Sequence, residues 1–185
     1  MIYVTSDLHF CHSREFLYEP RGFRTIEEHD AAVIERWNSW VGPEDDVYVL
    51  GDLVLNDIDK GIEYLKMLNG KIHVIRGNHD TDTKMARYAE CPNIVEICDG
   101  SKFFRYKKFH FLLSHYPTLT SNYDNEKPLR ARMINVCGHS HTKDRFADFD
   151  KGLIYHAELD VNDCYPIAIE EIIEDIKERL NGELY

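Results

Sequence analysis

The chain has 185 residues, with 33 acidic and 22 basic side chains and a formal net charge of -11. This length suits one globular domain with a sizeable core, and we expect residues 1–185 to form a single domain because no linker or repeat divides them. So acidic a chain is a poor partner for extended DNA or RNA, which favour a broad basic face. Because no apolar run approaches the roughly 20 residues that span a bilayer, we expect no membrane segment.

The cysteines and the amino terminus indicate the compartment. The five cysteines are odd in number and form no Cys-x-x-Cys pair, which is typical of reduced thiols. The amino terminus runs directly into a predicted strand, without the features of a secretory signal. We therefore expect a cytoplasmic protein, either a monomer or a homodimer, with its cysteines buried as small apolar side chains.

The first half of the sequence alternates β-branched runs with amphipathic segments. Strands are predicted at residues 2–5, 47–50 and 72–75, and helices at about 25–41, 59–69 and 81–90. Thr25 and Glu28 form a capping box at the start of the first helix, and Thr81 or Asp82 can cap the third. This alternation predicts an α/β arrangement.

Strands dominate the second half, with predicted positions 95–98, 103–106, 109–113, 133–136, 153–156 and 166–169. A last helix carries Ile172, Ile173, Ile176 and Leu180 on one face and ends near Gly182. Helices first, strands in the middle and one helix last are typical of two packed sheets with helices outside.

Five short segments that follow predicted strands end in residues that bind metals. They are Asp7-Leu8-His9, Gly51-Asp52, Gly77-Asn78-His79-Asp80, Ser114-His115 and Gly138-His139-Ser140-His141. Open α/β sheets place their ligand sites at the carboxyl ends of strands, so we expect these segments to meet. One Asp-x-His or Gly-Asp would mean little, but five in this setting indicate a shared site for two metal ions.

The donor types restrict the metal. Carboxylates, imidazoles and one amide oxygen, without a thiolate, suit Mn, Fe, Zn, Co or Ni, whereas calcium prefers a set made mostly of oxygens. Two cations about 3.5 to 4 Å apart need a bridging group and serve phosphoryl chemistry by clamping the attacking and leaving oxygens. Asp52 is the candidate bridge, because Gly51 has no side chain to block the turn that aims its carboxylate.

In these five blocks the chain resembles the calcineurin-like metallophosphoesterases, whose pattern is Asp-x-His, Gly-Asp, Gly-Asn-His-Asp/Glu, a lone His and Gly-His-x-His. The resemblance runs from Asp7 to His141 and matches nine chemically demanding positions. It implies a four-layer α/β/β/α sandwich of two mixed β-sheets flanked by helices. It also implies hydrolysis of a phosphoester with two divalent metal ions, for which manganese is favoured and Fe, Zn, Ni or Co are alternatives.

The resemblance also implies a role for each residue. One metal would be held by Asp7, His9, Asp52 and His141, and the other by Asp52, Asn78, His115 and His139. The nucleophile would be a hydroxide that bridges the metals. His79 would face the substrate and protonate the leaving oxygen or stabilise its charge, with Asp80 helping to orient it.

Other residues are candidates for contact with the substrate. His12 lies close enough to His9 to reach a phosphate oxygen, although an ordinary surface histidine is the alternative. Arg76 matches an arginine that contacts phosphate in the protein-phosphatase branch, or it pairs with an acid on the sheet. The stretch 118–127 is a candidate substrate loop in which Tyr123 could stack on a base.

Charge bears on the substrate class. Between Lys102 and Lys151 the chain has ten basic and five acidic residues. This span forms either a positive approach to the metals for an anionic substrate or solvated positions on strands and loops, and the two interpretations have similar weight.

A small anionic phosphoester is the expected substrate, with nucleotides among the candidates and extended nucleic acid disfavoured. A phosphodiester is favoured, because small single-domain proteins of the resembled family often act on diesters. A phosphomonoesterase or pyrophosphatase is the alternative activity. A non-catalytic scaffold of the same fold is a further alternative, against which the retention of His79 argues.

Overall fold

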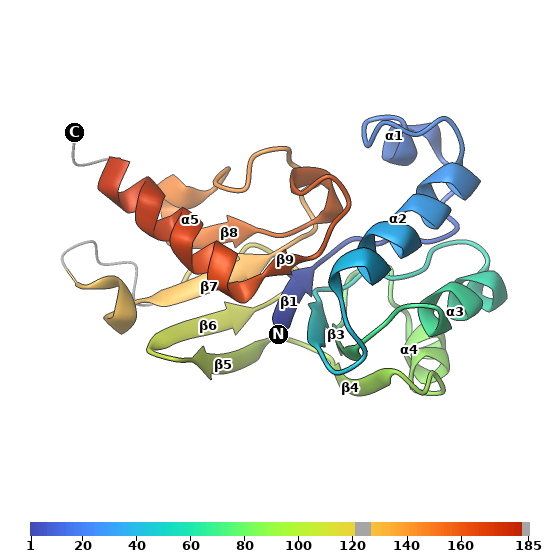
Figure 1. The fold of residues 1–185 in the computed structure, drawn as a ribbon, viewed down its shortest axis with the longest axis horizontal. Helices are drawn as coiled ribbons and strands as arrows, with labels where there is room; N and C mark the ends of the chain where they lie inside the picture. Colours follow the sequence, from blue (N-terminus) through green and yellow to red (C-terminus); the bar gives the residue numbers. More distant parts are fainter. Residues whose placement is uncertain (121–126, 183–185) are drawn as a thin grey trace.

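The computed structural model describes residues 1–120 and 127–182, whose strands form two mixed β-sheets. The five-stranded sheet has the order β4-β3-β2-β1-β9 and the four-stranded sheet the order β5-β6-β7-β8. In the first, β1 to β4 run parallel and β9 is antiparallel to β1; in the second, β6, β7 and β8 run parallel and β5 is antiparallel to β6. The predicted pair of mixed sheets flanked by helices is confirmed (Figure 1).

The element bounds follow the predicted order. The strands are β1 (Ile2–Thr5), β2 (Asp46–Val49), β3 (Lys71–Ile75), β4 (Ile94–Cys98), β5 (Lys102–Tyr106), β6 (Phe109–Leu113), β7 (Met133–Cys137), β8 (Ile154–His156) and β9 (Ile167–Ala168). The helices are α1 (Glu15–Tyr18), α2 (Ile26–Trp40), α3 (Ile58–Lys66), α4 (Asp82–Tyr88) and α5 (Ile169–Gly182), with short 3-10 turns at η1 (Leu129–Ala131), η2 (Phe149–Lys151) and η3 (Leu159–Val161).

Side-chain caps fix where the predicted helices begin. Thr25 accepts a hydrogen bond from the Glu28 backbone N–H, as the capping box predicts, and Thr81 rather than Asp82 caps α4. Asp57 caps α3, so that helix begins before the predicted position. The helix α1 and the 3-10 turns were not predicted, since three or four residues are too few to show a helical period.

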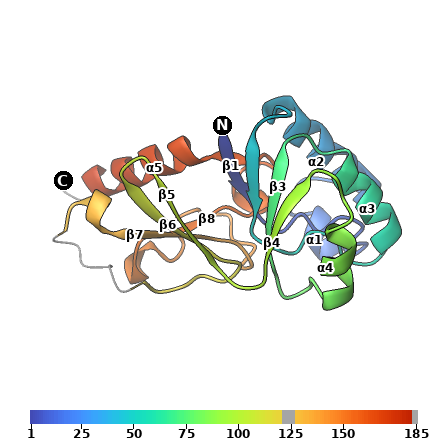
Figure 2. The same cartoon turned by 90° about the horizontal axis from the view of Figure 1, so that it is seen from below.

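Two apolar cores hold the layers together. One lies between α2, α3, α4 and the five-stranded sheet, with Trp37 and Leu65 fully buried in it. The other brings Ile75 of the first sheet against Phe111 and Val136 of the second, and α5 adds its isoleucine stripe to this core. Figure 2 shows α2, α3 and α4 on one side of the molecule and α5 beside the second sheet.

The structure also shows the state of the cysteines and the character of the helices, which concern the expected burial of the thiols and the expected lack of a membrane segment. All five cysteines are free thiols, and four are buried, whereas Cys98 is only partly buried because it ends an outer strand. Across residues 1–120 and 127–182, the helices are too short or too polar to cross a membrane.

Gly61 in α3 provides a test of the packing under the first sheet. A Cβ at this position would lie 2.2 Å from Cγ1 of Val54, which pairs with Phe10 beside the first ligand loop. Gly61→Ala should therefore lower the free energy of unfolding by about 1 to 3 kcal/mol, although alanine is the better helix former. Urea denaturation followed by circular dichroism measures this change.

The matched control for Gly61 is Gly182→Ala in α5, where an added Cβ meets nothing within 4 Å. This variant should be as stable as the parent protein or slightly more stable. Equal effects of the two substitutions would contradict the packing explanation.

Candidate metal centre

The five predicted segments meet at the carboxyl ends of the strands. Asp7, Asp52 and Asn78 follow β1, β2 and β3 of the first sheet, and His115 and His139 follow β6 and β7 of the second. Backbone hydrogen bonds hold neighbouring loops together, including one of 3.0 Å from Asp7 N–H to the carbonyl of Gly51 and one of 3.0 Å from Gly138 N–H to the carbonyl of His115. The donors of the centre are therefore divided between two sheets.

One group of ligand atoms gathers around His9. Its Nε2 lies 3.2 Å from Nε2 of His141, 3.5 Å from Oδ1 of Asp7 and 3.7 Å from Oδ2 of Asp52. Asp7 Oδ1 and His141 Nε2 are 3.7 Å apart. Two atoms bound about 2.1 Å from one ion lie about 3 to 3.5 Å apart, so this spacing suits a shared cation.

A second group gathers around His115. Its Nε2 lies 2.7 Å from Oδ1 of Asn78, 3.2 Å from Nδ1 of His139 and 3.6 Å from Oδ2 of Asp52. The Asn78 oxygen and the His139 nitrogen are 2.9 Å apart. The same oxygen of Asp52 thus borders both groups, which is the position required of a bridging ligand.

Asp7 supplies an independent sign that the centre is built for cations. Its carboxylate is fully buried, and Oδ1 has no hydrogen-bond partner. Its other oxygen accepts a hydrogen bond of 2.8 Å from the His139 N–H. An uncompensated buried carboxylate oxygen costs several kcal/mol, so the donor set fits divalent metal ions.

The histidine tautomers also suit metal binding. His115 Nδ1 donates to the carbonyl of Leu50 at 2.7 Å, and His141 Nδ1 lies 3.0 Å from a carboxylate oxygen of Asp160. With the proton on Nδ1, each Nε2 keeps its lone pair directed at the centre.

Protonation states follow from burial and neighbouring charges. Burial would raise the pKa of Asp7, but the adjacent His9 ring, together with His141 and His115, outweighs this effect and holds that pKa well below its usual range. Burial lowers the pKa of His9 and of His139, which favours neutral imidazoles. Burial also raises the pKa of Asp52. The carboxyl of Asp52 therefore holds a proton at higher pH than that of Asp7, and a cation that binds there has to displace it.

Glycines let the loops approach one another. A Cβ at Gly138 would lie 2.0 Å from Oγ of Ser6 and 2.4 Å from Oδ2 of Asp7, and one at Gly77 would lie 2.2 Å from Oδ1 of Asp52. The glycines of these motifs are therefore required by close contact with the carboxylates, in addition to the turn that was expected at Gly51.

Several non-glycine residues of the centre adopt left-handed backbone conformations. They are Asp7, His9, Asp52, His139 and His141, with φ between 48° and 72°. Such conformations are uncommon for non-glycine residues, persist only when the surrounding structure enforces them, and cluster at functional sites. Their concentration here supports a functional role for the centre, on grounds separate from the chemistry of its side chains.

His79 and Asp80 have different environments. The His79 side chain is 48% exposed, and its Nε2 lies 4.0 Å from Oδ2 of Asp52. Asp80 is buried and accepts hydrogen bonds from the backbone N–H groups of Asp52, Leu53 and Gly77 and from the hydroxyl of Tyr88. These bonds hold the loop that carries Asp52, and a role for Asp80 in orienting His79 stays a prediction.

The structure shows the surroundings of His12 and Arg76, the two residues considered for contact with the substrate. His12 is 7% exposed and packs edge-on against His9, so it is not an ordinary surface histidine. Arg76 pairs with Asp82 of α4 and, at 3.2 Å, with Asp99 in the turn after β4, so its acidic partners do not lie on the sheet. Tyr123 and its neighbours 121–126 lie outside the described residues.

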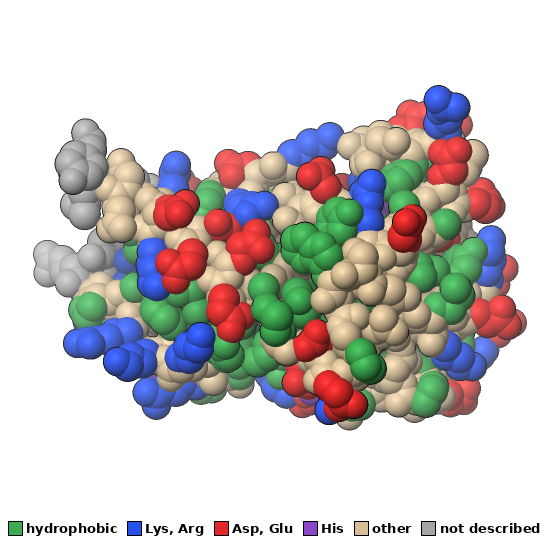
Figure 3. All heavy atoms as spheres, viewed as in Figure 1, with side chains coloured by type: hydrophobic (Ala, Val, Ile, Leu, Met, Phe, Trp, Pro, Cys, Tyr) green, Lys and Arg blue, Asp and Glu red, His purple; other side chains and the backbone are tan. Residues whose placement is uncertain are grey.

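Several residues of the basic span are paired with acids or lie away from the centre. Lys102 pairs with Glu96, Arg145 with Asp175 and Lys151 with Asp148. Residues 107 and 108 occupy the turn that begins β6, whereas His115 follows the other end of that strand. Figure 3 shows basic side chains gathered over this turn. These positions support the interpretation of solvated strand and loop residues.

Asp160 and Arg21 were missed by the sequence analysis. Asp160 accepts from His141 and, at 3.1 and 2.7 Å, from Nε and Nη2 of Arg21. Burial would raise the pKa of Asp160, but the hydrogen bond with His141 and the charge of Arg21 lower it below its usual range. Arg21 also donates to the carbonyl of Asp7 at 2.9 Å. The pair of Arg21 and Asp160, called the Asp160 brace below, therefore holds both Asp7 and His141 of the first ligand set.

The brace continues into α2. Arg21 donates to Nε2 of His29 at 3.0 Å, and His29 Nδ1 contacts Asp30, whose other oxygen accepts from the Cys11 N–H at 2.9 Å. No local motif marks these residues, because their contacts join segments that are distant in the sequence.

Fold and centre together define the class of protein. Residues 1–156 match the calcineurin-like phosphoesterase superfamily domain, and the chain belongs to this superfamily. The matched domain is that of a phosphoesterase superfamily, and the centre contains groups of residues that could hold a metal ion.

Individual relatives extend the match. An uncharacterised protein of Methanocaldococcus jannaschii is 38% identical over 127 residues, which cover 66% of this chain and 64% of that protein, less than two thirds of its length. The gene 66 protein of Mycobacterium phage L5 is 38% identical over 161 residues, covering 76% of this chain and 77% of the phage protein. The crystal structure of a protein of unknown function from Aquifex aeolicus has a TM-score of 0.71 and 26% identity, covering 94% of this chain and 98% of that one.

The Asp160 brace can be tested by Asp160→Asn. Loss of the carboxylate charge weakens the hold on His141 and leaves Arg21 without its ionic partner, so metal affinity should fall by about 10- to 100-fold. Titration of chelator-stripped protein with Mn²⁺ in a calorimeter measures the change. The control is Asp163→Asn, three residues away, which should bind as the parent does; equal affinity in both variants would remove Asp160 from the centre.

Proposed function

We propose that this protein is a phosphodiesterase that uses two divalent metal ions, with manganese favoured. The observation that supports two ions is the shared oxygen of Asp52, which lies 3.7 Å from His9 Nε2 and 3.6 Å from His115 Nε2. Asp7, His9 and His141 would complete one ligand set, and Asn78, His115 and His139 the other.

The charges beside the centre favour a diester over a monoester. A phosphate monoester carries close to two negative charges at neutral pH, whereas a diester carries one. Two arginines next to the ligand loops are already paired, Arg21 with Asp160 and Arg76 with Asp82 and Asp99. A singly charged phosphate that relies on the metal ions alone is therefore the better fit.

Side chains beside the centre would assist the metal ions in the reaction. When bound, the two ions would lower the pKa of water and offset the negative charge of the phosphate oxygens. His79 is exposed toward the centre, and its backbone N–H donates to Oδ1 of Asp52 at 2.8 Å, which fixes its place beside the bridge. From there its ring can donate a proton to the departing ester oxygen. Lys84 holds the same turn by donating to the carbonyls of His79 and Val54.

Hydrolysis of paired chromogenic esters tests the function. Chelator-stripped protein restored with Mn²⁺ should cleave bis(p-nitrophenyl) phosphate faster than p-nitrophenyl phosphate. His79→Ala should reduce this turnover by about a hundredfold or more, because it removes the acid. Its metal content should stay near that of the parent.

His110→Ala, on β6, is the matched control. Preference for the monoester would establish the alternative activity. An unchanged rate in His79→Ala would refute the role of His79.

The bridging role of Asp52 has its own test. Asp52→Asn removes a charged ligand from both groups, so both activity and metal content should fall, the latter well below two ions per chain. Mass spectrometry of the purified, metal-loaded protein gives the stoichiometry. Asp150→Asn, an exposed substitution on η2, serves as the control, and a variant at Asp52 that retains two ions would disprove the bridge.

A further inference from the structure

Tyr116 is an exposed aromatic side chain directly beside the centre. It follows His115 in the loop after β6, and 51% of it is exposed. Its ring packs edge-on against the ring of His115, with centroids 5.0 Å apart, and against that of His139, at 4.7 Å. A flat group stacked on Tyr116 would therefore lie next to the second ligand set.

The Tyr116 loop is held in place from both sides. The Tyr116 carbonyl accepts hydrogen bonds from the hydroxyls of Ser114, at 2.8 Å, and Thr118, at 2.9 Å. The Thr118 N–H donates to the buried side chain of Asn135 at 2.8 Å. An exposed ring on an anchored loop loses little conformational freedom when a ligand stacks on it.

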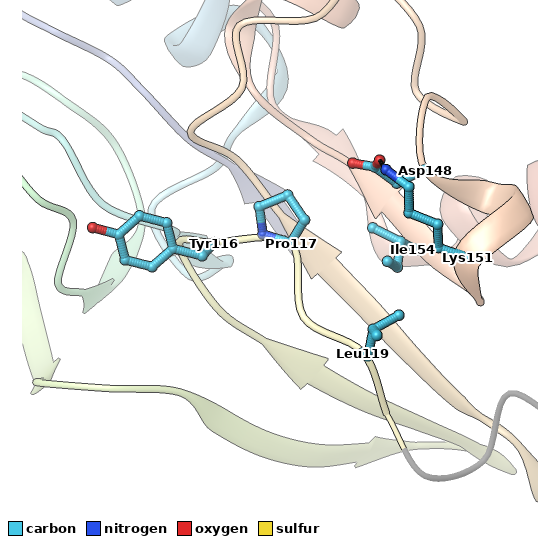
Figure 4. Close-up of a pocket in the computed structure, with 6 residues that line it drawn as sticks. All are labelled: Tyr116, Pro117, Leu119, Asp148, Lys151 and Ile154. Carbon is cyan, nitrogen blue, oxygen red and sulfur yellow. Dashed lines mark hydrogen bonds and ion pairs between the residues drawn. The ribbon is translucent and has the colours of Figure 1, made fainter.

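Tyr116 borders two cavities. One, of about 670 Å³, is mostly apolar and lies on the side of Pro117, Leu119 and Ile154. Figure 4 shows that the Tyr116 ring points away from the other residues of this cavity. The second, of about 260 Å³, is lined by both Tyr116 and His115 and so lies beside the second ligand set.

The walls of the second cavity indicate what it can hold. They include Ser101, Thr118, Asp99 and Arg76. Arg76 is paired with Asp82 and Asp99, so the cavity has no excess of positive charge to attract a second phosphate. Hydroxyl and carboxylate groups instead form hydrogen bonds with the hydroxyls of a sugar.

We propose that Tyr116 and this cavity form a subsite for the nucleoside arm of a phosphodiester, with the base stacked on Tyr116 and the sugar in the cavity. The subsite rests on the proposed phosphodiesterase function and adds to it a substrate class. Its volume suits a sugar-sized group, since clefts for drug-sized ligands begin at about 300 Å³. The inferred substrate is a nucleotide ester without a further phosphate on that arm.

The test compares two esters that release the same leaving group. Thymidine 5′-(p-nitrophenyl phosphate) has a nucleoside arm, and methyl p-nitrophenyl phosphate has none. The ratio of their kcat/KM values measures the contribution of the nucleoside arm. The Mn²⁺-loaded parent protein should favour the thymidine ester by tenfold or more. Tyr116→Leu should reduce this ratio by about tenfold, as expected for loss of base stacking, and Tyr116→Phe should preserve it.

Two further variants make the comparison decisive. Phe103→Leu replaces a 55% exposed aromatic side chain on β5, away from the centre, and should leave the ratio unchanged. Phe16 is 73% exposed and packs on His12 at the other side of the centre. If Phe16→Leu removes the preference and Tyr116→Leu does not, the base binds on the other side and the proposal is wrong. A parent ratio near one would also overturn it.

Binding separates this proposal from the proposed function. Calorimetry measures the affinities of the Mn²⁺-loaded protein for thymidine 5′-monophosphate and for inorganic phosphate, and so tests the subsite without turnover. The nucleotide should bind at least tenfold more tightly than phosphate, and Tyr116→Leu should remove most of that difference. If neither ester is cleaved but this pattern holds, the phosphodiesterase function fails and the subsite remains; equal affinities refute the subsite itself.

Discussion

Two carboxylates buried side by side impose the constraint on which this structure depends. Asp7 and Asp52 are almost inaccessible to water, and their ligand oxygens lie within 4.8 Å of each other and of a nitrogen of His115. Like charges at this distance in a buried place repel strongly and need compensation by cations. The glycine contacts, the left-handed backbone and the neutral imidazoles around them all serve to hold this arrangement.

The centre is asymmetric between its floor and its open face. Asp7, His9, Asp52 and His115 are buried, whereas Asn78, His79, His139 and His141 are reached by solvent. A rigid, dry floor keeps ligands in place, and an open face admits a phosphoester. Reactive and recognition groups therefore belong on the open face, where His79 and Tyr116 lie.

The sequence revealed the part of this centre that has a local pattern. Each ligand segment directly follows an apolar run, so strand ends and metal donors could be predicted together, and the Thr25 and Thr81 caps were visible for the same reason. The contact between Arg21 and Asp160 spans 139 positions and has no motif, so only the folded chain shows it. Likewise the sequence left Arg76 with two alternatives, phosphate contact or an ion pair, because it does not show which carboxylates fold next to this residue.

The division of donors between two sheets has a consequence for folding. Asp7 and Asp52 belong to one sheet and His115, His139 and His141 to the other, so the complete site exists only after the sheets dock. Any ion bound there acts as a cross-brace and adds stability in proportion to the logarithm of its concentration, about 4 kcal/mol at a thousand times its dissociation constant. The amount of folded protein in a cell would then follow the supply of the metal.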